Sequence, residues 1–389
     1  MLKRIPIVGL PITLRDLFSG FFAGKTAQIN LAHAISKLCN LKYVYFTDSA
    51  TSSLYVILEA LKNKQHKKEV ILPAYTATSL IIAIKKANLK PVLCDISLDD
   101  FQLDINLLTR LVSEKTLCIV GVHMFGIVHR DLGGLKEKFP DIFIIEDCAQ
   151  GLGSRINGVP VGDLADMSFF SFNRGKNLPT YGGGCIATNS EELSEAISQE
   201  LKRQVIETGL GEKAAIILKN FALSLAVRPW VYGLSYPLIS LFREIAPHQD
   251  FSVKTYTDFQ AGVALSLLKR IEEFSQKRYA NGMKLIEGFK DIEDITLPKI
   301  SADTQPALNR LPILFKDLKR RQELEKRLGK NGVETSRMYF RSLHQLFNLG
   351  YKKEEFPIAN YFAEHLLMLP VHPLVREKDL LKMVEIIKK

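Results

Sequence analysis

The sequence predicts an α/β fold, with a large domain built on a mostly parallel β-sheet between helices and a smaller C-terminal α/β domain. From about residue 43, short apolar runs alternate with longer amphipathic stretches, which is the pattern of strands and helices in a sheet covered on both faces. A chain of 389 residues is also too long for one ordinary hydrophobic core. We therefore expect a large domain at 1–250 and a small domain at 251–389.

The expected strands of the large sheet are short apolar runs rich in β-branched and aromatic residues. They lie at 43–46, 70–72, 91–94, 117–122, 142–146 and 167–172, and helices are expected near 51–62, 77–88, 103–113 and 131–138. Ligands bind at the carboxyl ends of parallel strands. The polar residues that follow these runs are therefore the first candidates for a site.

The second half of the chain carries longer helical patterns. A helical region from about 190 to 245 is followed by a helix near 257–289, and then by a strand at 308–315 with helices at 317–328 and 376–388. This change of pattern places the domain boundary near residue 250.

An apolar stretch at 213–243 stands out within the helical region. It contains an uncharged run, 229–242, between Arg228 and Arg243. The run is too short to cross a bilayer. Two interpretations stay open: a buried helix pair at a domain or subunit interface, which we favour, or a basic amphipathic segment that contacts the inner face of a membrane.

Charge and cysteine usage narrow the class of protein. The formal net charge is +10, and the lysines and arginines are scattered along the chain. This excess of positive charge favours anionic ligands or an anionic surface. The sequence contains no recognised nucleic-acid-binding module, so we do not expect nucleic acid as a partner. An odd number of cysteines without a CxxC motif predicts buried reduced thiols in a cytoplasmic protein, with no disulfides and no metal site. These are Cys39, Cys94, Cys118, Cys148 and Cys185. The apolar N-terminus is not a secretion signal, because Pro6 and Pro11 interrupt it.

A carboxylate and a lysine stand at the ends of two expected strands. Asp147 closes the strand at 142–146, and Lys176 lies in the polar loop after the strand at 167–172. The glycines at 182–184 follow this lysine and let the backbone approach a ligand closely. A lysine amine can hold an aldehyde cofactor as a Schiff base, and a carboxylate can keep a pyridine nitrogen protonated. This pair therefore indicates pyridoxal 5'-phosphate (PLP).

A phosphate site is expected between the first strand and its helix. The segment Ser49-Ala50-Thr51-Ser52-Ser53-Leu54 places four hydroxyl groups at a helix N-terminus, where free N–H groups and hydroxyls bind anions. Ser171 is placed to add another hydroxyl beside Lys176. Arg174, Arg337 and Tyr339 are further candidates for contacts with an anionic substrate.

At these residues the chain resembles the DegT/DnrJ-type family of PLP-dependent sugar aminotransferases. This family has the aspartate-aminotransferase fold, PLP fold type I. The resemblance rests on six motifs that occur in the family's order. The similarity is dense from about residue 43 to 190 and looser from 257 to 389. The motifs are SGTxAL at Ser49–Leu54, PxxT at Pro73–Thr76, VHxxG at Val122–Gly126, EDxAQ at Glu146–Gln150, SFxxxK at Ser171–Lys176 and LPxHP at Leu369–Pro373.

The resemblance implies a role for each matched residue. Lys176 would form the Schiff base and carry the proton, and Asp147 would pair with the pyridinium nitrogen. Gln150 would lie against the cofactor ring. The hydroxyls that would hold the phosphate are those of Thr51, Ser52 and Ser171. The family also implies a homodimer in which each site is completed by the partner subunit.

Two features depart from the family pattern. Where the family usually has an aromatic residue that stacks on the cofactor, this chain has Ala77, so stacking is either missing or supplied by Tyr75. The family's asparagine ahead of its QA-containing helix, which it uses across the dimer, has no counterpart before the helix that starts near 257. The cofactor site is therefore more firmly expected than the contact between subunits.

The resemblance implies an aminotransferase that moves an amino group from glutamate to a keto-sugar, with the sugar linked to a nucleotide. The product would be an amino sugar for a surface polysaccharide or a secondary metabolite. Two alternatives stay open. One is a PLP-dependent sugar dehydratase, although that branch of the family carries histidine where this chain has Lys176. The other is a non-catalytic or regulatory relative that associates with a membrane surface.

Overall fold

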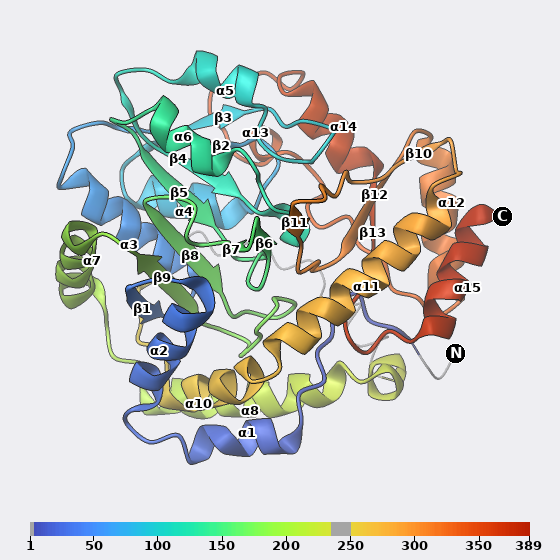
Figure 1. Ribbon diagram of the computed structural model, residues 1–389, viewed down its shortest axis with the longest axis horizontal. Coiled ribbons are helices and arrows are strands. Elements are labelled where there is room, and N and C mark those ends of the chain that lie inside the picture. Colours follow the sequence, from blue (N-terminus) through green and yellow to red (C-terminus); the bar gives the residue numbers. More distant parts are fainter. Residues whose placement is uncertain (1–3, 235–249) are drawn as a thin grey trace.

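The computed structural model describes residues 4–234 and 250–389. A seven-stranded sheet forms the centre of the larger part, with helices on both of its faces (Figure 1). Its strands are β1 Tyr43–Thr47, β2 Glu69–Pro73, β3 Lys90–Cys94, β4 Thr116–Val122, β5 Phe143–Asp147, β8 Met167–Ser171 and β9 Gly184–Thr188. The order is β1-β9-β8-β5-β4-β2-β3, and the only antiparallel pairs in this sheet are the two that β9 makes. The mostly parallel sheet is therefore confirmed.

The expected helices connect these strands. They are α3 Ala50–Lys62, α4 Thr78–Lys86, α5 Ile105–Leu111 and α6 Leu132–Lys138. Local sequence explains where some of them begin: the Ser49 hydroxyl accepts from the amide of Ser52, and the Asp104 carboxylate accepts from two amides of α5. The carboxyl ends of β1, β2, β5 and β8 thus lead into short polar loops at one edge of the sheet.

A smaller α/β unit follows toward the C-terminus. Its antiparallel sheet consists of β10 Ile295–Thr296, β12 Leu311–Phe315 and β13 Leu366–Leu369. The helices α11 Ile271–Phe289, α12 Leu318–Lys330, α14 Pro357–His365 and α15 Glu377–Lys388 pack on this sheet or on one another. A third small sheet joins β6 Arg155–Ile156 and β7 Val159–Pro160 to β11 Thr304–Gln305. It links the loop after β5 to the C-terminal part.

The helices differ from the sequence prediction in two places. The region from 190 to 245 contains α7 Glu191–Gln204 and α8 Leu210–Ala226, separated where Ile206 forms a bridge with Lys254. The expected helix at 257–289 is broken at Lys269 and Arg270 into α10 Asp258–Leu268 and α11. Residues 235–249, which carry part of the uncharged run at 229–242, lie outside the described residues.

Two N-terminal helices, α1 Leu14–Phe21 and α2 Ala27–Cys39, pack against α10. Thr13 and Asp16 form a capping box that starts α1. Because α10 follows residue 250 in sequence but packs on these helices, the large unit includes it in space. The boundary at 250 stays a prediction.

The extended segment before α1 reaches the C-terminal unit. Ile5 forms a parallel bridge with Val333, and the amide of Ile7 donates to the Glu334 carboxylate at 2.8 Å. The Tyr232 hydroxyl donates to the same carboxylate at 2.6 Å. The segment thus ties together parts of the chain that are far apart in sequence.

The structure tests the expected burial of the cysteines and shows whether a described helix could cross a membrane. All five cysteines are buried free thiols, which confirms the predicted burial of these side chains. Among residues 4–234 and 250–389, no helix combines the length and the hydropathy that crossing a membrane requires.

Candidate active site

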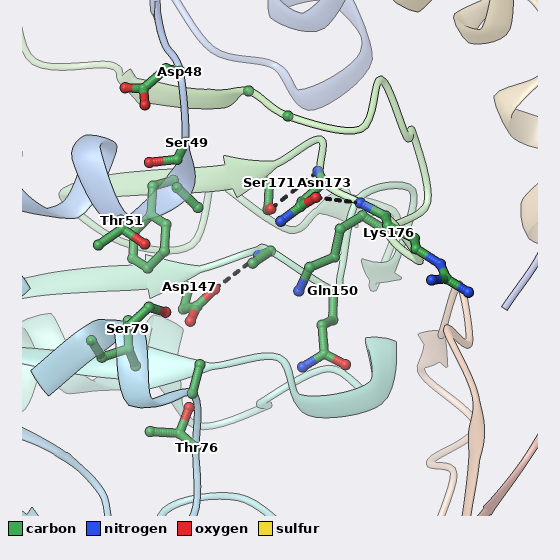
Figure 2. Close-up of a pocket in the computed structure, with 18 of the residues that line it drawn as sticks. Asp48, Ser49, Thr51, Thr76, Ser79, Asp147, Gln150, Ser171, Asn173 and Lys176 are labelled. Atoms are coloured by element: carbon green, nitrogen blue, oxygen red, sulfur yellow. Dashed lines mark hydrogen bonds between the residues drawn. The ribbon is translucent and has the colours of Figure 1, made fainter. Parts of the chain in front are cut away.

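A cavity of about 260 Å³ opens at the carboxyl ends of β1, β2, β5 and β8. Figure 2 shows its side chains converging from loops that are distant in sequence. The labelled residues that line it are Asp48, Ser49, Thr51, Thr76, Ser79, Asp147, Gln150, Ser171, Asn173 and Lys176. The position agrees with the rule that ligands of parallel sheets bind at the strand ends.

The Lys176 amine faces this cavity without a partner. It makes no hydrogen bond or ion pair with the residues that the structure describes, although the side chain is half-buried. Burial lowers the pKa of Lys176 to about 8; Asp147 opposes this shift, and Arg310 adds to it. An amine with a lowered pKa is more often neutral, and the neutral form is the nucleophile.

Asp147 ends β5 and is almost fully buried. One of its carboxylate oxygens accepts a hydrogen bond from the amide of Ala149 at 2.9 Å. Burial raises the pKa of Asp147, and the nearby Lys176 and His123 oppose that shift. The second oxygen has no hydrogen-bond partner among the described residues, so this carboxylate can still accept a bond from a ligand.

Two helix N-termini point into the same space. Ser49 caps α3, and the hydroxyl of Thr51 in its first turn lines the cavity. Helix α4 begins after Ala77, which gives no side-chain cap, and Thr76 and Ser79 line the cavity beside it. Free N–H groups and the helix dipole favour an anion at such ends. The cavity is therefore suited to a phosphate group.

The glycines at 182–184 allow a close backbone approach, as the sequence predicts. Gly182 and Gly183 line the cavity. A Cβ atom on Gly184 would lie 2.3 Å from the carbonyl oxygen of Ser49, and Gly183 has φ +109°. Glycine is thus required for β9 to pass beside the start of α3.

The loop that carries Lys176 is held by buried amides. The Asn309 side chain donates to the Gly175 carbonyl at 2.6 Å and to the Asn177 side chain at 3.1 Å. Asn177 in turn donates to the carbonyl of Leu152 at 2.8 Å. The backbone on the N-terminal side of Lys176 is therefore fixed from the C-terminal unit.

A buried ionisable pair lies behind Asp147. The amide of His129 donates to His123 Nδ1 at 3.0 Å, so His123 Nε2 carries the hydrogen and donates to Glu146 at 2.9 Å. The other donors to Glu146 are the amides of Gly162 and Leu164. These bonds fix the end of β5 from behind the cavity. His123, Glu146 and Cys148 lie close enough to suggest a metal site, but hydrogen bonds account for the His123–Glu146 contact.

The structure brings most of the sequence-predicted residues together. Lys176, Asp147, Gln150, Thr51 and Ser171 all line the cavity. Ser52 does not line it: its hydroxyl is buried and donates to the Asp48 carboxylate at 2.8 Å. Of the candidates for anion contacts, Arg174 and Tyr339 line the cavity, and Arg337 is absent from its lining.

The suggestion that Tyr75 stacks on a cofactor is wrong. Tyr75 is buried, its hydroxyl donates to the carbonyl of Arg337 at 2.9 Å, and its ring packs on Phe362. The aromatic residues that do line the cavity are Tyr339 and Phe169. Sequence reasoning missed Asp48, Ser79 and Asn173, although each lies beside a predicted strand end or helix start. It also missed Phe169, which lies within the predicted strand at 167–172.

The chain matches one protein family over nearly its whole length, and related sequences are known. The model of the DegT/DnrJ/EryC1/StrS aminotransferase family matches residues 18–388. An uncharacterized protein of Methanocaldococcus jannaschii is 28% identical over 360 residues, which are 90% of this chain and 86% of that protein. The dTDP-3-amino-3,4,6-trideoxy-alpha-D-glucose transaminase of Streptomyces venezuelae is 25% identical over 329 residues, 82% of this chain and 76% of the relative.

Solved structures share the fold. A Streptococcus pneumoniae protein assigned as a sugar aminotransferase, solved in its PLP form, superposes with a TM-score of 0.80 at 23% identity. The match covers 99% of this chain and 98% of that one. The fold is therefore that of PLP fold type I, as the sequence predicts.

Proposed function

Because the chain belongs to the DegT/DnrJ/EryC1/StrS aminotransferase family, we propose that it moves an amino group from glutamate to a keto-sugar linked to a nucleotide. As a member of this family, the chain is a PLP-dependent aminotransferase, and the reaction class is sugar transamination. The glutamate donor, the nucleotide link and the residue roles that follow are proposals.

One observation carries the proposal: a single cavity holds an unpaired amine, a buried carboxylate and two helix N-termini (Figure 2). These groups come from separate segments of the chain, and each has bonding capacity that the described residues leave unused. Such a set is typical of a site built for a ligand with an aldehyde, a ring nitrogen and a phosphate.

The residues fit PLP. Lys176 would bind its aldehyde, Asp147 would pair with its pyridine nitrogen, and Gln150 would lie against its ring. Thr51, Ser171 and the N-terminus of α3 would hold its phosphate, and the Ser52 hydroxyl would join them only by leaving Asp48. Bound PLP supplies the electron sink that amine transfer requires.

Lys176 is the residue to which we assign proton transfer. Its pKa of about 8 leaves an appreciable neutral fraction near neutral pH, so the amine can accept a proton from one substrate atom and return it to another. Asp147 would place its carboxylate beside the pyridine nitrogen of bound PLP. The buried His123–Glu146 pair holds the end of β5 and therefore positions Asp147.

The positive charge near the cavity supports a phosphate-bearing sugar as the acceptor of the amino group. Arg174 lines the cavity, and Arg310 acts on both Lys176 and Tyr339 through its positive charge. Cations at this edge favour a substrate that carries phosphate groups. The name of the Streptomyces venezuelae relative, which specifies a dTDP sugar, supports a nucleotide link here. The homodimer stays a prediction.

The test begins with the absorbance spectrum of purified protein loaded with PLP, before and after glutamate. We expect glutamate to remove the long-wavelength band and release 2-oxoglutarate. Keto-sugars linked to dTDP, UDP and GDP are then supplied, and amino-sugar products are detected by mass spectrometry. A band that ignores glutamate but responds to another amino acid would contradict the donor, and amination of free sugars alone would contradict the nucleotide link.

A further inference from the structure

Helix α1 presents a row of exposed apolar side chains. Leu14, Phe18 and Phe21 are spaced at i, i+4 and i+7 and therefore share one face. Each is about half exposed, and Phe22, directly after the helix, is 85% exposed. A row of this kind on a water-facing helix is unusual.

Helix α8 keeps apolar side chains exposed although its fully buried positions are polar. Its buried residues are the polar Asn220 and Ser224. The Asn220 side chain donates to the carbonyl of Thr180 at 3.0 Å, and the Ser224 hydroxyl donates to the carbonyl of Asn220 at 2.6 Å. Leu218 and Leu225, spaced at i and i+7, are exposed, Leu218 by 71%. Ile217, Phe221 and Leu223 also pack, partly buried, against the core. Leu218 and Leu225 thus extend the apolar surface of this helix outward into solvent.

The two rows meet in one surface. The ring of Phe221 on α8 lies 6.2 Å from that of Phe18 and 6.1 Å from that of Phe21, and the two helices lie side by side (Figure 1). We call this surface the apolar patch. It consists of Leu14, Phe18, Phe21, Phe22, Leu218, Phe221 and Leu225. Contiguous exposed patches of this kind mark surfaces that bind a partner.

The charges around the apolar patch are effectively of one sign. The exposed cations Arg15, Lys219 and Arg228 form no ion pair with the residues that the structure describes. Two acidic residues lie on the same helices, but Asp16 is buried and pairs with Arg270, and Glu212 pairs with Lys254. The patch is therefore bordered by uncompensated positive charge.

We propose that the apolar patch rests on the surface of an anionic phospholipid membrane. Leucine and phenylalanine side chains bordered by lysine and arginine are the composition of helices that lie in the headgroup region, and anionic lipids attract the bordering cations. A second copy of the chain is a poorer occupant. A two-fold contact through this face would set the same cations of both copies against each other.

The only tryptophan of the chain provides the probe. Trp230 follows α8 by a few residues and is 62% exposed. Its fluorescence is followed in the full chain, loaded with PLP, as vesicles are added. One set contains phosphatidylglycerol and phosphatidylcholine in equal parts, and the other contains phosphatidylcholine alone. We expect the emission to shift to shorter wavelength, and the protein to sediment with the vesicles, only with the anionic set and less at high salt.

Two leucines form a matched pair for the control. Leu218 lies in the apolar patch and Leu381 lies on α15, and they are 71% and 66% exposed. We expect Leu218→Ser to weaken vesicle binding and Leu381→Ser to leave it unchanged. The double variant Arg15→Glu, Lys219→Glu should weaken binding to anionic vesicles by at least about tenfold.

Several outcomes would overturn the proposal. These are no binding to anionic vesicles, equal binding to both vesicle sets, or equal effects of the two leucine substitutions. A Trp230 shift that depends on protein concentration without vesicles, together with association that Leu218→Ser abolishes, would assign the apolar patch to a second copy of the chain.

Discussion

The side chain of Asn309 donates a hydrogen bond to the carbonyl of Gly175 at 2.6 Å. Gly175 immediately precedes Lys176, and Asn309 lies just before β12 of the C-terminal unit. The proposed catalytic loop is thus held by a residue from a distant part of the sequence. A group held so tightly can act without first being ordered by its substrate.

We expect Asn309→Ala to lower both stability and turnover. The change removes the donor to the part-buried carbonyl of Gly175 and to the buried side chain of Asn177, which costs about 1–3 kcal/mol. The loosened loop should reduce kcat about ten- to a hundred-fold. Urea unfolding and glutamate-dependent formation of 2-oxoglutarate measure the two effects. Asn348→Ala, at an exposed asparagine, is the control and should change neither. Unchanged turnover in Asn309→Ala would contradict the positioning role.

Lys176→Ala should abolish transamination, with a loss of at least about a thousand-fold, because it removes the nucleophile and the proton carrier together. Lys42→Ala, at an exposed lysine, should retain full activity. The measurement is single-turnover release of 2-oxoglutarate from the PLP-loaded protein. Substantial turnover in Lys176→Ala would remove this residue from the reaction.

The rate of PLP capture should rise with pH up to about 8 and then level off. Only the neutral amine adds to an aldehyde, and the pKa of Lys176 is lowered to about 8, so each pH unit below 8 reduces the neutral fraction about tenfold. The lowered pKa also means that the unfolded chain binds this proton more tightly. The contribution of Lys176 to apoprotein stability should therefore rise between about pH 8 and 10.5 and vanish in Lys176→Met.

Stopped-flow absorbance measures the capture rate, and thermal unfolding of the apoprotein measures the stability. A rate that keeps rising to pH 10 would show that the Lys176 amine has an ordinary pKa. It would then contradict the role of burial in activating this residue.

Asp147→Asn should reduce turnover at least about a hundred-fold and shift the capture profile to lower pH. The negative charge of Asp147 holds the pKa of Lys176 up, so its removal lowers that pKa further. Repeating the pH series in this variant measures the shift. A midpoint that stays near pH 8 would show that the two side chains do not interact.

Glu146→Ala should destabilise the protein by about 3–5 kcal/mol, because the substitution leaves the buried donors of His123, Gly162 and Leu164 without their acceptor. Urea unfolding monitored by circular dichroism gives the free energy. Glu293→Ala, at an exposed glutamate, should change it by less than about 0.5 kcal/mol. A small effect in Glu146→Ala would mean that these buried donors find other acceptors.

The sequence predicts the sheet and the two central residues for a clear reason. Apolar runs between amphipathic stretches are a local signal, and parallel strands bring their carboxyl ends to one edge, so Asp147 and Lys176 could be placed together before the structure was known. The burial of the cysteines is predictable for a similar reason, since Cys94 and Cys118 lie within expected strands.

Other features depend on contacts that local patterns do not encode. Strand β9 follows glycines that look like a loop, and it is a strand because it pairs with β1 and β8. Phe169 lines the cavity from within β8, where no motif marks it. Tyr75 stands in a motif but is withdrawn by its hydrogen bonds to the backbone of residues 337 and 339.

The bond between Ile7 and Glu334 joins residues that are 327 positions apart. During synthesis, the segment around Ile7 emerges early, but its partners are made only after most of the chain has left the ribosome. This segment can therefore be ordered only late in folding, and contacts of such separation slow the final step. Removing it should leave the large sheet able to form but would take away the bridge to Val333 and the bond to Glu334, so the last part of the C-terminal unit to be anchored would lose its N-terminal contacts.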